Sequence, residues 1–269
     1  MMGLTDLFGE KKTASWFLTL VIACLTSALL PARAAVLIWP TNIFIDSKEK
    51  GAALWLENRG ETVQTYQMRL YAWSQNDGKD ELGEQNGIVG SPPIMEIEPG
   101  KRQLIRLIRT RMPPPGTELT YRIILDEIPS VQAEEPDKAN GVKFRMRYSI
   151  PVFVFGEGLS SQSLPGNEEQ DTDKPLIASH LSWRIKNGSK QKMLEISNSG
   201  PVHVHLRNLT FAGTAGTETN PRGPAGYILP HTTMSWPVTS GMGSGPILLA
   251  LVNGKQLIRI NAANAEEAD

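Results

Sequence analysis

The sequence predicts an all-β protein of two β-sandwich domains, and three observations support that prediction. Apolar and polar residues alternate along most of the chain, which is the period of a strand. No stretch keeps a helical stripe for three turns, and Gly, Pro, Asn and Asp separate the short runs at regular spacing. Of the 269 residues, the 235 that follow a removable N-terminal segment suit two domains of about 100–120 residues each.

The first 34 residues have the pattern of a secretory signal peptide. A lysine pair at residues 11–12 precedes an uncharged apolar stretch at residues 16–30, and Ala-Arg-Ala at residues 32–34 forms a small-x-small cleavage site. The apolar stretch is shorter than the roughly 20 residues that a spanning helix needs. We expect cleavage before Ala35, with a membrane anchor and a lipoprotein site at Cys24 as the alternatives.

Removal of this segment would leave a chain that lacks cysteine and is close to neutral. Cys24 is the only cysteine, so the mature chain would hold no disulfide, no thiol nucleophile and no cysteine metal ligand. The segment also takes three basic and two acidic residues, so 24 basic and 26 acidic residues remain, a net charge of −2. That balance argues against a nucleic-acid binder.

Strand patterns fill two regions on either side of a polar segment. Residues 35–156 are expected to form the first domain, residues 176–261 the second, and residues 262–269 a flexible tail. Residues 157–175 are acidic and rich in Gly, Ser and Pro, which is typical of a linker or loop. The expected strands are residues 52–58, 66–73, 104–108, 121–128, 142–155, 181–185, 192–197, 202–206 and 246–252, with hairpin turns at Asn187-Gly188 and Asn253-Gly254.

The longest expected strand, residues 142–155, has one apolar face and, in its first half, one basic face. Two readings are open: the apolar face fills the domain's own core, or the strand's edge and apolar residues are lent to a partner chain. The apolar face is formed by Val142, Phe144, Met146, Tyr148, Ile150, Val152 and Val154.

A charged residue interrupts another apolar strand. Arg122 lies within Tyr121–Leu125, where a charge is costly unless it is paired. One interpretation is an edge-strand arginine whose head reaches water. The other is an anion anchor, because a guanidinium can hold a carboxylate with two hydrogen bonds.

The sequence offers little for catalysis or metal binding. His203 and His205 would share one face of a strand and could hold a metal with a third ligand, but no Cys, Asp or Glu completes the set by spacing, and two exposed histidines are the alternative. Asp126 and Glu127 are adjacent in a strand, so they point to opposite faces and cannot form a catalytic pair. We predict no enzyme activity, no cofactor and no metal.

Several segments carry a family resemblance when they are taken together and in order. They are Ala35–Pro40 (AVLIWP), Leu54–Asn58 (LWLEN), Gly90–Pro93 (GSPP), Ile97–Arg106 (IEPGKRQLIR), Tyr121–Pro129 (YRIILDEIP) and, more loosely, Asn198–Pro201 and Tyr227–Pro230. They resemble the PapD-like periplasmic chaperones of pilus assembly by the chaperone–usher route. The residue patterns at 53–60, 102–109 and 147–153 are similar to those of the archaic branch of that family.

The resemblance implies two immunoglobulin-like sandwiches in an L-shaped or boomerang arrangement, working in the periplasm. It implies pilus subunits and an outer-membrane usher as partners, with possible self-association of the free chaperone. A subunit of this kind lacks a strand, and the chaperone's last strand of domain one fills the groove, a mode called donor-strand complementation. Carried over to this chain, the donor strand would present Val142, Phe144, Met146 and Tyr148.

The resemblance also implies a site for the subunit's terminal carboxylate in the cleft between the domains. The two basic residues that hold it in the best-known branch align here with Asn42 and Pro151, so both charges are missing. We hypothesise that Arg122 replaces them, with Arg147 or Thr41 as helper. The alternatives to a pilus chaperone are a secreted two-domain binding module without a pilus client and a periplasmic metal-binding protein.

Two further features follow from the resemblance. A cis peptide bond is expected in the Ser91-Pro92-Pro93 motif. Glu127 matches the glutamate of an interdomain ion-pair network whose other positions align near Phe155 and Asn253. Because neither partner position is charged, we expect that network to be absent and the interdomain angle to depend on other contacts.

Overall fold

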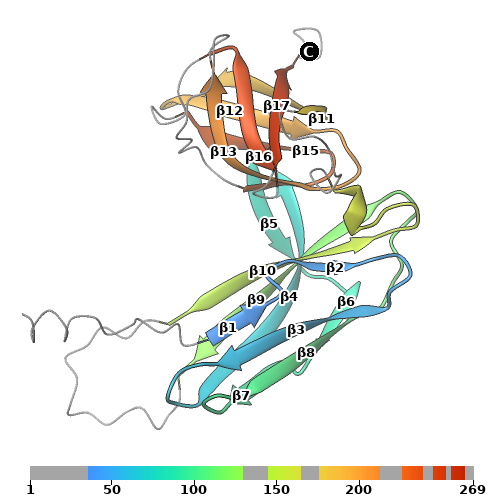
Figure 1. Cartoon of the computed structure of the whole chain (residues 1–269), viewed down its shortest axis with the longest axis vertical. Coiled ribbons are helices and arrows are strands. Elements are labelled where there is room, and N and C mark those ends of the chain that lie inside the picture. Colours follow the sequence, from blue (N-terminus) through green and yellow to red (C-terminus); the bar gives the residue numbers. More distant parts are fainter. Residues whose placement is uncertain are drawn as a thin grey trace, which may run out of the picture.

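The protein folds into two β-rich lobes that meet at an angle (Figure 1). The computed structural model describes residues 36–129, 145–164, 176–212, 226–238, 245–252 and 256–263. Strands β1 to β10 build the first lobe and strands β11 to β17 the second. Within these ranges no helix is long and apolar enough to cross a membrane. The all-β, two-domain prediction is therefore confirmed.

The first lobe is a sandwich of two sheets. One sheet has the order β1 (Val36–Trp39), β3 (Gly51–Asn58), β8 (Arg102–Arg109) and β6 (Ile88–Ser91). The other has the order β2 (Ile43–Ile45), β10 (Arg147–Phe155), β9 (Glu118–Ile128), β4 (Gln64–Asn76) and β5 (Lys79–Gly83), with β7 (Ile94–Ile97) also paired to β4. All neighbours are antiparallel except β2 and β10, which run parallel.

Strand alternation builds the core of this lobe. Leu54 and Leu56 of β3 are fully buried, as are Ile123 and Leu125 of β9 on the facing sheet. In β3 their neighbours in sequence are more exposed, which is the in–out pattern of a packed antiparallel sandwich, whereas Ile124 of β9 is also buried, on the opposite face. Tyr66 of β4 joins the same core, and burial raises the pKa of its hydroxyl.

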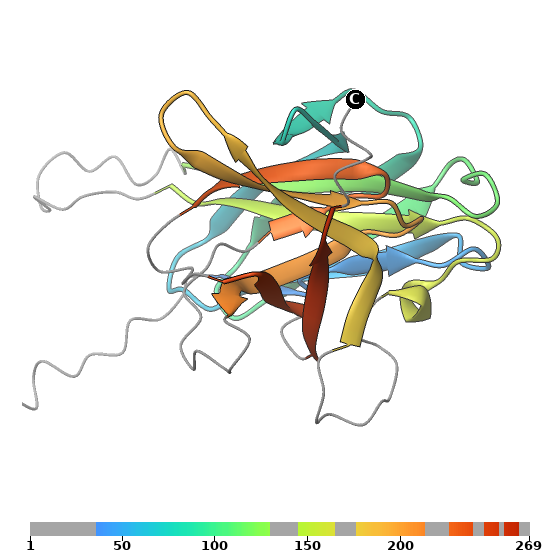
Figure 2. The ribbon, with the colours of Figure 1, turned by 90° about the horizontal axis from the view of Figure 1, so that it is seen from above.

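The second lobe is formed by one continuous seven-stranded sheet. Its end strands β14 and β15 contact each other, so the sheet curls around a single core. In the view from above, this lobe overlies the first (Figure 2). The order is β14 (Gly226–Ile228), β13 (Val204–Ala212), β16 (Ile247–Val252), β17 (Gln256–Ala262), β11 (Leu176–Asn187), β12 (Lys192–Asn198) and β15 (Thr232–Pro237).

Several local predictions are confirmed. The Ser91–Pro92 peptide bond is cis, and so is Trp39–Pro40. Asn187 pairs with Lys192 across the predicted hairpin between β11 and β12. The second hairpin signal, at residues 253–254, lies outside the described ranges, although the strands on either side of it do pair antiparallel.

Part of the segment expected to be a linker is packed onto the first lobe. Residues 161–163 form a short 3₁₀ helix, and Ser161 donates its backbone N–H to Oδ1 of Asp46 at 2.9 Å. Leu164 is buried in a cluster of residues from both lobes. Residues 165–175 of the expected linker lie outside the described ranges.

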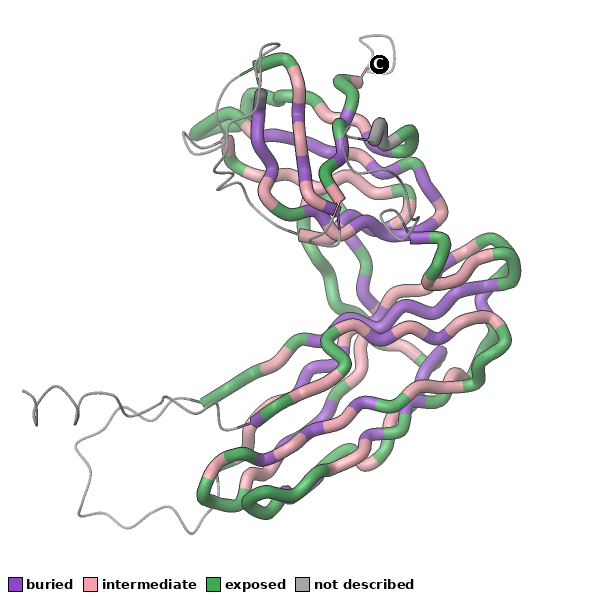
Figure 3. The backbone as a smooth tube through the Cα atoms, viewed as in Figure 1, coloured by how far each residue is buried: buried purple, intermediate pink, exposed green. Residues whose placement is uncertain are grey.

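A third apolar cluster fills the junction between the lobes. In Figure 3 the buried backbone continues from the first lobe through the point where the lobes meet. The second half of β10 is buried on both faces, because one face packs in the first core and the other meets the second lobe. The junction cluster is formed by Trp73, Phe153, Phe155, Leu164, Val202 and Leu229.

Candidate functional site

Strand β10 has a free edge along its first half. Strand β9 borders it over residues 147–155, whereas β2 borders its other side only over residues 152–154. Among the strands that the structure describes, none borders residues 147–151 on that second side. An edge of this kind presents backbone groups that are ready to pair with another chain.

The pairing pattern shows which backbone groups face outward. Glu127 donates its backbone N–H to the carbonyl oxygen of Met146 at 3.1 Å, so these two residues face each other with their hydrogen-bonding groups. Hydrogen bonding alternates along an antiparallel ladder. The N–H and C=O groups of Arg147 and Ser149 therefore point away from β9, toward the free edge.

The predicted donor residues have different surroundings. Met146 is 47% exposed, which leaves its side chain available. Tyr148 packs against the first core, with its ring 6.4 Å from that of Tyr66, so its predicted role as a pocket filler is not supported. Val142 and Phe144 lie outside the described residues.

Arg147 is engaged in an ion-pair cluster on the outer face of the sheet. Its Nε donates to Oδ1 of Asp126 at 2.5 Å, and Arg69 donates to the other oxygen of the same carboxylate. The two guanidinium groups lower the pKa of Asp126 by their hydrogen bonds. Arg147 of β10 pairs with Asp126 of β9. Asp126 lies four residues from Arg122 along β9, a spacing of about 13 Å. The structure thus does not bring Arg147 to Arg122.

Arg122 is a mostly buried cation whose guanidinium makes no hydrogen bond to the other residues that the structure describes. Its side chain is 14% exposed, and its guanidinium carbon lies 3.6 Å from the ring centre of Trp73. The nearest carboxylate in the described part of the chain is that of Asp80, 4.0 Å away, at the limit of an ion pair. Burial lowers the pKa of Arg122. A desolvated guanidinium with unused N–H groups is suited to hold a carboxylate.

The two positions expected to hold an anchor lie in one row with Arg122. Pro151 of β10 is the direct partner of Arg122 on β9. Ile43 pairs with Val152, so Asn42, one residue earlier, lies beside Pro151. Positions 42 and 151 carry no positive charge, but Arg122 places one in the same row, on the neighbouring strand β9.

A side chain from the second lobe reaches this row. The Tyr227 hydroxyl donates to Oδ1 of Asn42 at 3.0 Å, and the Tyr227 ring centre lies 5.5 Å from the guanidinium carbon of Arg122. Thr41 is exposed, and among the described residues no hydrogen bond joins it to Arg122. Asn42, rather than Thr41, is the polar residue that the structure places in contact with the second lobe.

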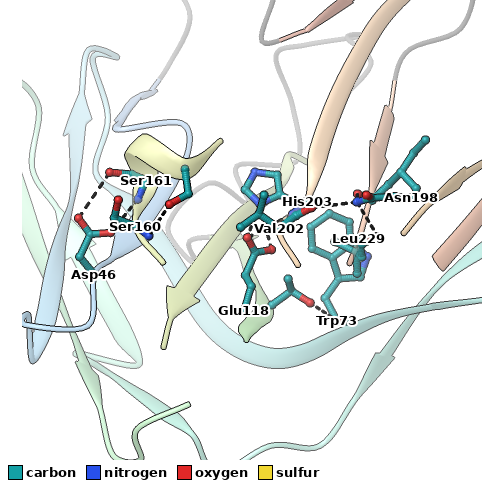
Figure 4. A network of polar contacts seen from close by, with 12 residues as sticks. Asp46, Trp73, Glu118, Ser160, Ser161, Asn198, Val202, His203 and Leu229 are labelled. Carbon is teal, nitrogen blue, oxygen red and sulfur yellow. Dashed lines mark hydrogen bonds and ion pairs between the residues drawn. The ribbon is translucent and has the colours of Figure 1, made fainter. Parts of the chain in front are cut away.

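A buried carboxylate–imidazole contact between Glu118 and His203 joins the lobes (Figure 4). Glu118 lies on the same face of β9 as Arg122, and its oxygens are 2.9 and 3.0 Å from Nδ1 of His203. The backbone N–H of His203 also donates to Glu118, and both side chains are almost inaccessible. The expected match of Glu127 to the interdomain glutamate is wrong, because Glu127 lies at the far end of β9 and contacts Met146.

Gln75 makes a second connection between the lobes. Its Nε2 donates to the carbonyl oxygen of Tyr227 at 2.9 Å, and its Oε1 accepts from the backbone N–H of Leu229 and the hydroxyl of Thr232, each at 2.9 Å. The hairpin of β4 and β5, which carries Gln75, extends into the second lobe, where Gly78 bridges to β15 (Figure 1). These contacts hold the second lobe against Trp73 and the row of Arg122.

The histidines are structural. His203 stacks on Phe153 with ring centres 3.5 Å apart, and His205 stacks on Tyr227 at 4.1 Å. The alternative of two exposed strand histidines is therefore wrong. Burial lowers the pKa of His205 to about 4. No group of three or more potential metal ligands occurs in the residues that the structure describes.

Sequence analysis missed Glu118, Gln75 and Tyr227. A local signal existed for Glu118 alone, since it is an acidic residue at the start of an apolar strand. The other two could not be found from spacing, because their partners are more than 150 residues away in the chain.

Comparison with known proteins fits this geometry. Residues 35–160 match the family of pili and flagellar-assembly chaperones, PapD N-terminal domain. A chain of the CsuC–CsuE chaperone–tip adhesion subunit pre-assembly complex, from the archaic chaperone–usher Csu pili of Acinetobacter baumannii, is 31% identical. The match has a TM-score of 0.65 and covers 86% of this chain and 100% of that chain. The protein belongs to the PapD-like family of pilus chaperones.

Two other similarities agree with membership of the PapD-like family. The chaperone protein FimB/FhaD of Bordetella pertussis is 26% identical over 220 residues, which cover 77% of this chain and 82% of that protein. The structure of the Salmonella enterica SafA pilin in complex with the SafB chaperone matches at 16% identity and a TM-score of 0.57, over 86% of this chain and 98% of that one. At that identity the likeness concerns the fold.

Proposed function

We propose that this PapD-like chaperone binds a pilus subunit along the free edge of β10 and delivers it to an outer-membrane usher. The observation that carries the proposal is that, among the described strands, residues 147–151 have a neighbour on one side only. An immunoglobulin-like subunit that lacks a strand could pair its groove with this edge by donor-strand complementation. The backbone groups of Arg147 and Ser149 would form the ladder.

Apolar side chains beside that edge would fill the subunit's groove. Met146 is exposed next to the free edge, and Val142 and Phe144 precede it with the same alternation. Covering an open apolar groove removes an aggregation hazard from the subunit. Tyr148 packs against the chaperone's own core, so the proposed pocket fillers are Val142, Phe144 and Met146.

The terminal carboxylate of the subunit would bind Arg122. This assignment rests on its burial, its position beside Pro151 and the weakness of its contact with Asp80. A guanidinium stacked on Trp73 is fixed in orientation, which favours two parallel hydrogen bonds to a carboxylate. Binding there would set the register in which the subunit pairs with β10.

The likeness to the Csu complex supports the archaic branch and a periplasmic location. The related chain comes from a pre-assembly complex with a tip adhesion subunit, so a subunit of this class is the proposed client. The signal-peptide pattern at residues 1–34 agrees with export. The exchange of the subunit from chaperone to usher would need no nucleotide and no cofactor, because the folding energy of the subunit drives it.

Co-expression with a fimbrial subunit tests the proposal. Met146→Asp places a charge where an apolar side chain would enter the groove, so co-purification of the subunit should be lost. Val89→Asp is the control, because Val89 lies on the other sheet and is 49% exposed, against 47% for Met146. This variant should recover the subunit like the wild type. Equal recovery of the subunit with wild type and Met146→Asp would refute binding along β10.

A further inference from the structure

The proposed anion site contains an amide whose orientation depends on the other lobe. Asn42 lies beside Pro151 in the row that ends at Arg122, and it is only partly buried. Tyr227 donates its hydroxyl hydrogen to Oδ1 of Asn42. An amide whose oxygen is occupied in this way presents its two Nδ2 hydrogens as donors.

Tyr227 is itself held from several directions. Its ring stacks on His205 with an interplanar angle of 6°, and it meets Trp73 edge-on at 5.5 Å. Its carbonyl oxygen accepts the hydrogen bond from Gln75 of the first lobe. A side chain fixed at its ring, its backbone and its hydroxyl loses little further freedom when it holds another group in place.

The surroundings of the Arg122 guanidinium favour an anion. Its guanidinium carbon lies 3.6 Å from the ring centre of Trp73 and 5.5 Å from that of Tyr227, and the Arg122 side chain is largely shielded from solvent. The only nearby carboxylate that the structure describes, Asp80, is 49% exposed and lies 4.0 Å away. Asp80 also accepts a hydrogen bond from Nε2 of Gln75, so its carboxylate is shared and neutralises the Arg122 guanidinium only weakly.

We propose that Tyr227 is a positioning residue for carboxylate binding: its hydroxyl orients the amide of Asn42 so that its N–H groups form a second donor in the row of Arg122, on the other side of Pro151. The inference rests on the proposed function, since it concerns the same carboxylate site. It adds that the site is completed by the second lobe. The Asn42 amide is then in place only when the lobes are docked. Gln75 and the contact between Glu118 and His203 hold them together.

Acetate serves as the probe for a carboxylate in the intact protein. Sodium acetate is titrated against sodium chloride at constant ionic strength, while NMR follows the indole N–H of Trp73 and the side-chain N–H groups of Arg122 and Asn42. We expect saturable shifts with acetate and none with N-methylacetamide, the neutral analogue. Tyr71→Phe is the matched control, because Tyr71 is the β4 partner of Arg122 in the strand register but its ring contacts Arg69.

A double-mutant cycle separates positioning from packing. Tyr227→Phe keeps the ring and should weaken acetate binding about fivefold, and Asn42→Ala should weaken it by a similar factor. With Asn42→Ala already present, Tyr227→Phe should have no further effect. Asn42→Ala changes a partly exposed residue and so gives an independent measurement if the tyrosine variant is poorly folded.

The outcomes distinguish this inference from the anchor assignment. If Arg122→Ala removes the response but Tyr227→Phe leaves the affinity unchanged, the positioning role is overturned and the anchor stands. The positioning role is also overturned if Tyr227→Phe weakens binding equally with and without the Asn42 amide. If Arg122→Ala binds acetate like the wild type, or if the wild type gives no saturable shift, both assignments fall.

Discussion

Arg122 lies directly opposite Pro151, the position where the best-known relatives are expected to carry a basic residue. The register of β9, β10 and the start of β2 puts both residues in one row with Asn42. One cation on β9 can therefore serve a region for which the resemblance implies two cations on other strands. Its place against Trp73 explains how a charge is accommodated within an apolar strand.

Removal of the Arg122 guanidinium should weaken subunit binding without harming the fold. Arg122→Ala removes the proposed charge-assisted hydrogen bonds, each worth about 1.5–3 kcal/mol, so Kd should rise roughly 10- to 100-fold. The variant should still fold, although its free energy of unfolding should fall modestly because the side chain also loses its stack on Trp73. Titration calorimetry with a purified subunit and urea unfolding measure the two effects. Arg106→Ala, on the other sheet, is the control, and an equal loss there would contradict a specific anchor.

Separation of Glu118 from His203 should loosen the lobes. Glu118→Ala leaves a buried imidazole without its hydrogen-bond partner, which typically costs about 1–3 kcal/mol. Because the two residues belong to different lobes, the loss should divide a single thermal transition into two, as seen by scanning calorimetry. The double variant with His203→Ala should lose less than the sum of the single variants.

An exposed ion pair provides the comparison for that experiment. Asp126→Ala removes the partner of Arg69 and Arg147 on the outer face of the same strand, where solvent screens the charges. Its thermal transition should stay close to that of the wild type. A similar change for Asp126→Ala and Glu118→Ala would show that the buried contact does not hold the lobes together.

The protein should lose stability on acidification, in part because of His205. Its folded-state pKa of about 4 lies below the ordinary histidine value of 6.5, so the unfolded chain binds a proton that the folded chain excludes. The stability that depends on a neutral His205 is fully present above pH 6.5 and is lost as the pH falls toward 4. Allowing for solvent screening of a half-buried ring, it amounts to about 2 kcal/mol. We expect urea unfolding at about pH 7.5 and about pH 4.5 to show that the free energy of unfolding falls less on acidification for His205→Gln than for the wild type. Equal falls would contradict the role of His205.

Local pattern was enough to predict the longer strands and part of the first core, but not short strands such as β2, β5 and β7. The alternation in residues 66–73 placed Tyr66 and Met68 on one face, and both are buried in that core. The same reasoning singled out Arg122 because a charge in an apolar run needs a compensating environment, and the structure provides one in Trp73.

Contacts between the lobes were beyond local pattern. The face of β10 that carries Phe153 and Phe155 is buried because the second lobe covers it, and alternation within the strand gives no sign of that cover. Gln75 reads as an ordinary polar residue near a turn, yet it is buried by partners from the other lobe. Such positions depend on how two separately folded units meet, which a periodic pattern does not encode.

Hydrogen exchange along β10 tests the central claim most directly. The backbone N–H groups of Arg147 and Ser149 face the free edge, so in the isolated chaperone they should exchange quickly, and in a complex with a pilus subunit they should become strongly protected. Val89, on the edge strand β6 of the other sheet, should exchange equally in both states. Unchanged exchange at Arg147 and Ser149 in a stable complex would contradict donation of the β10 edge.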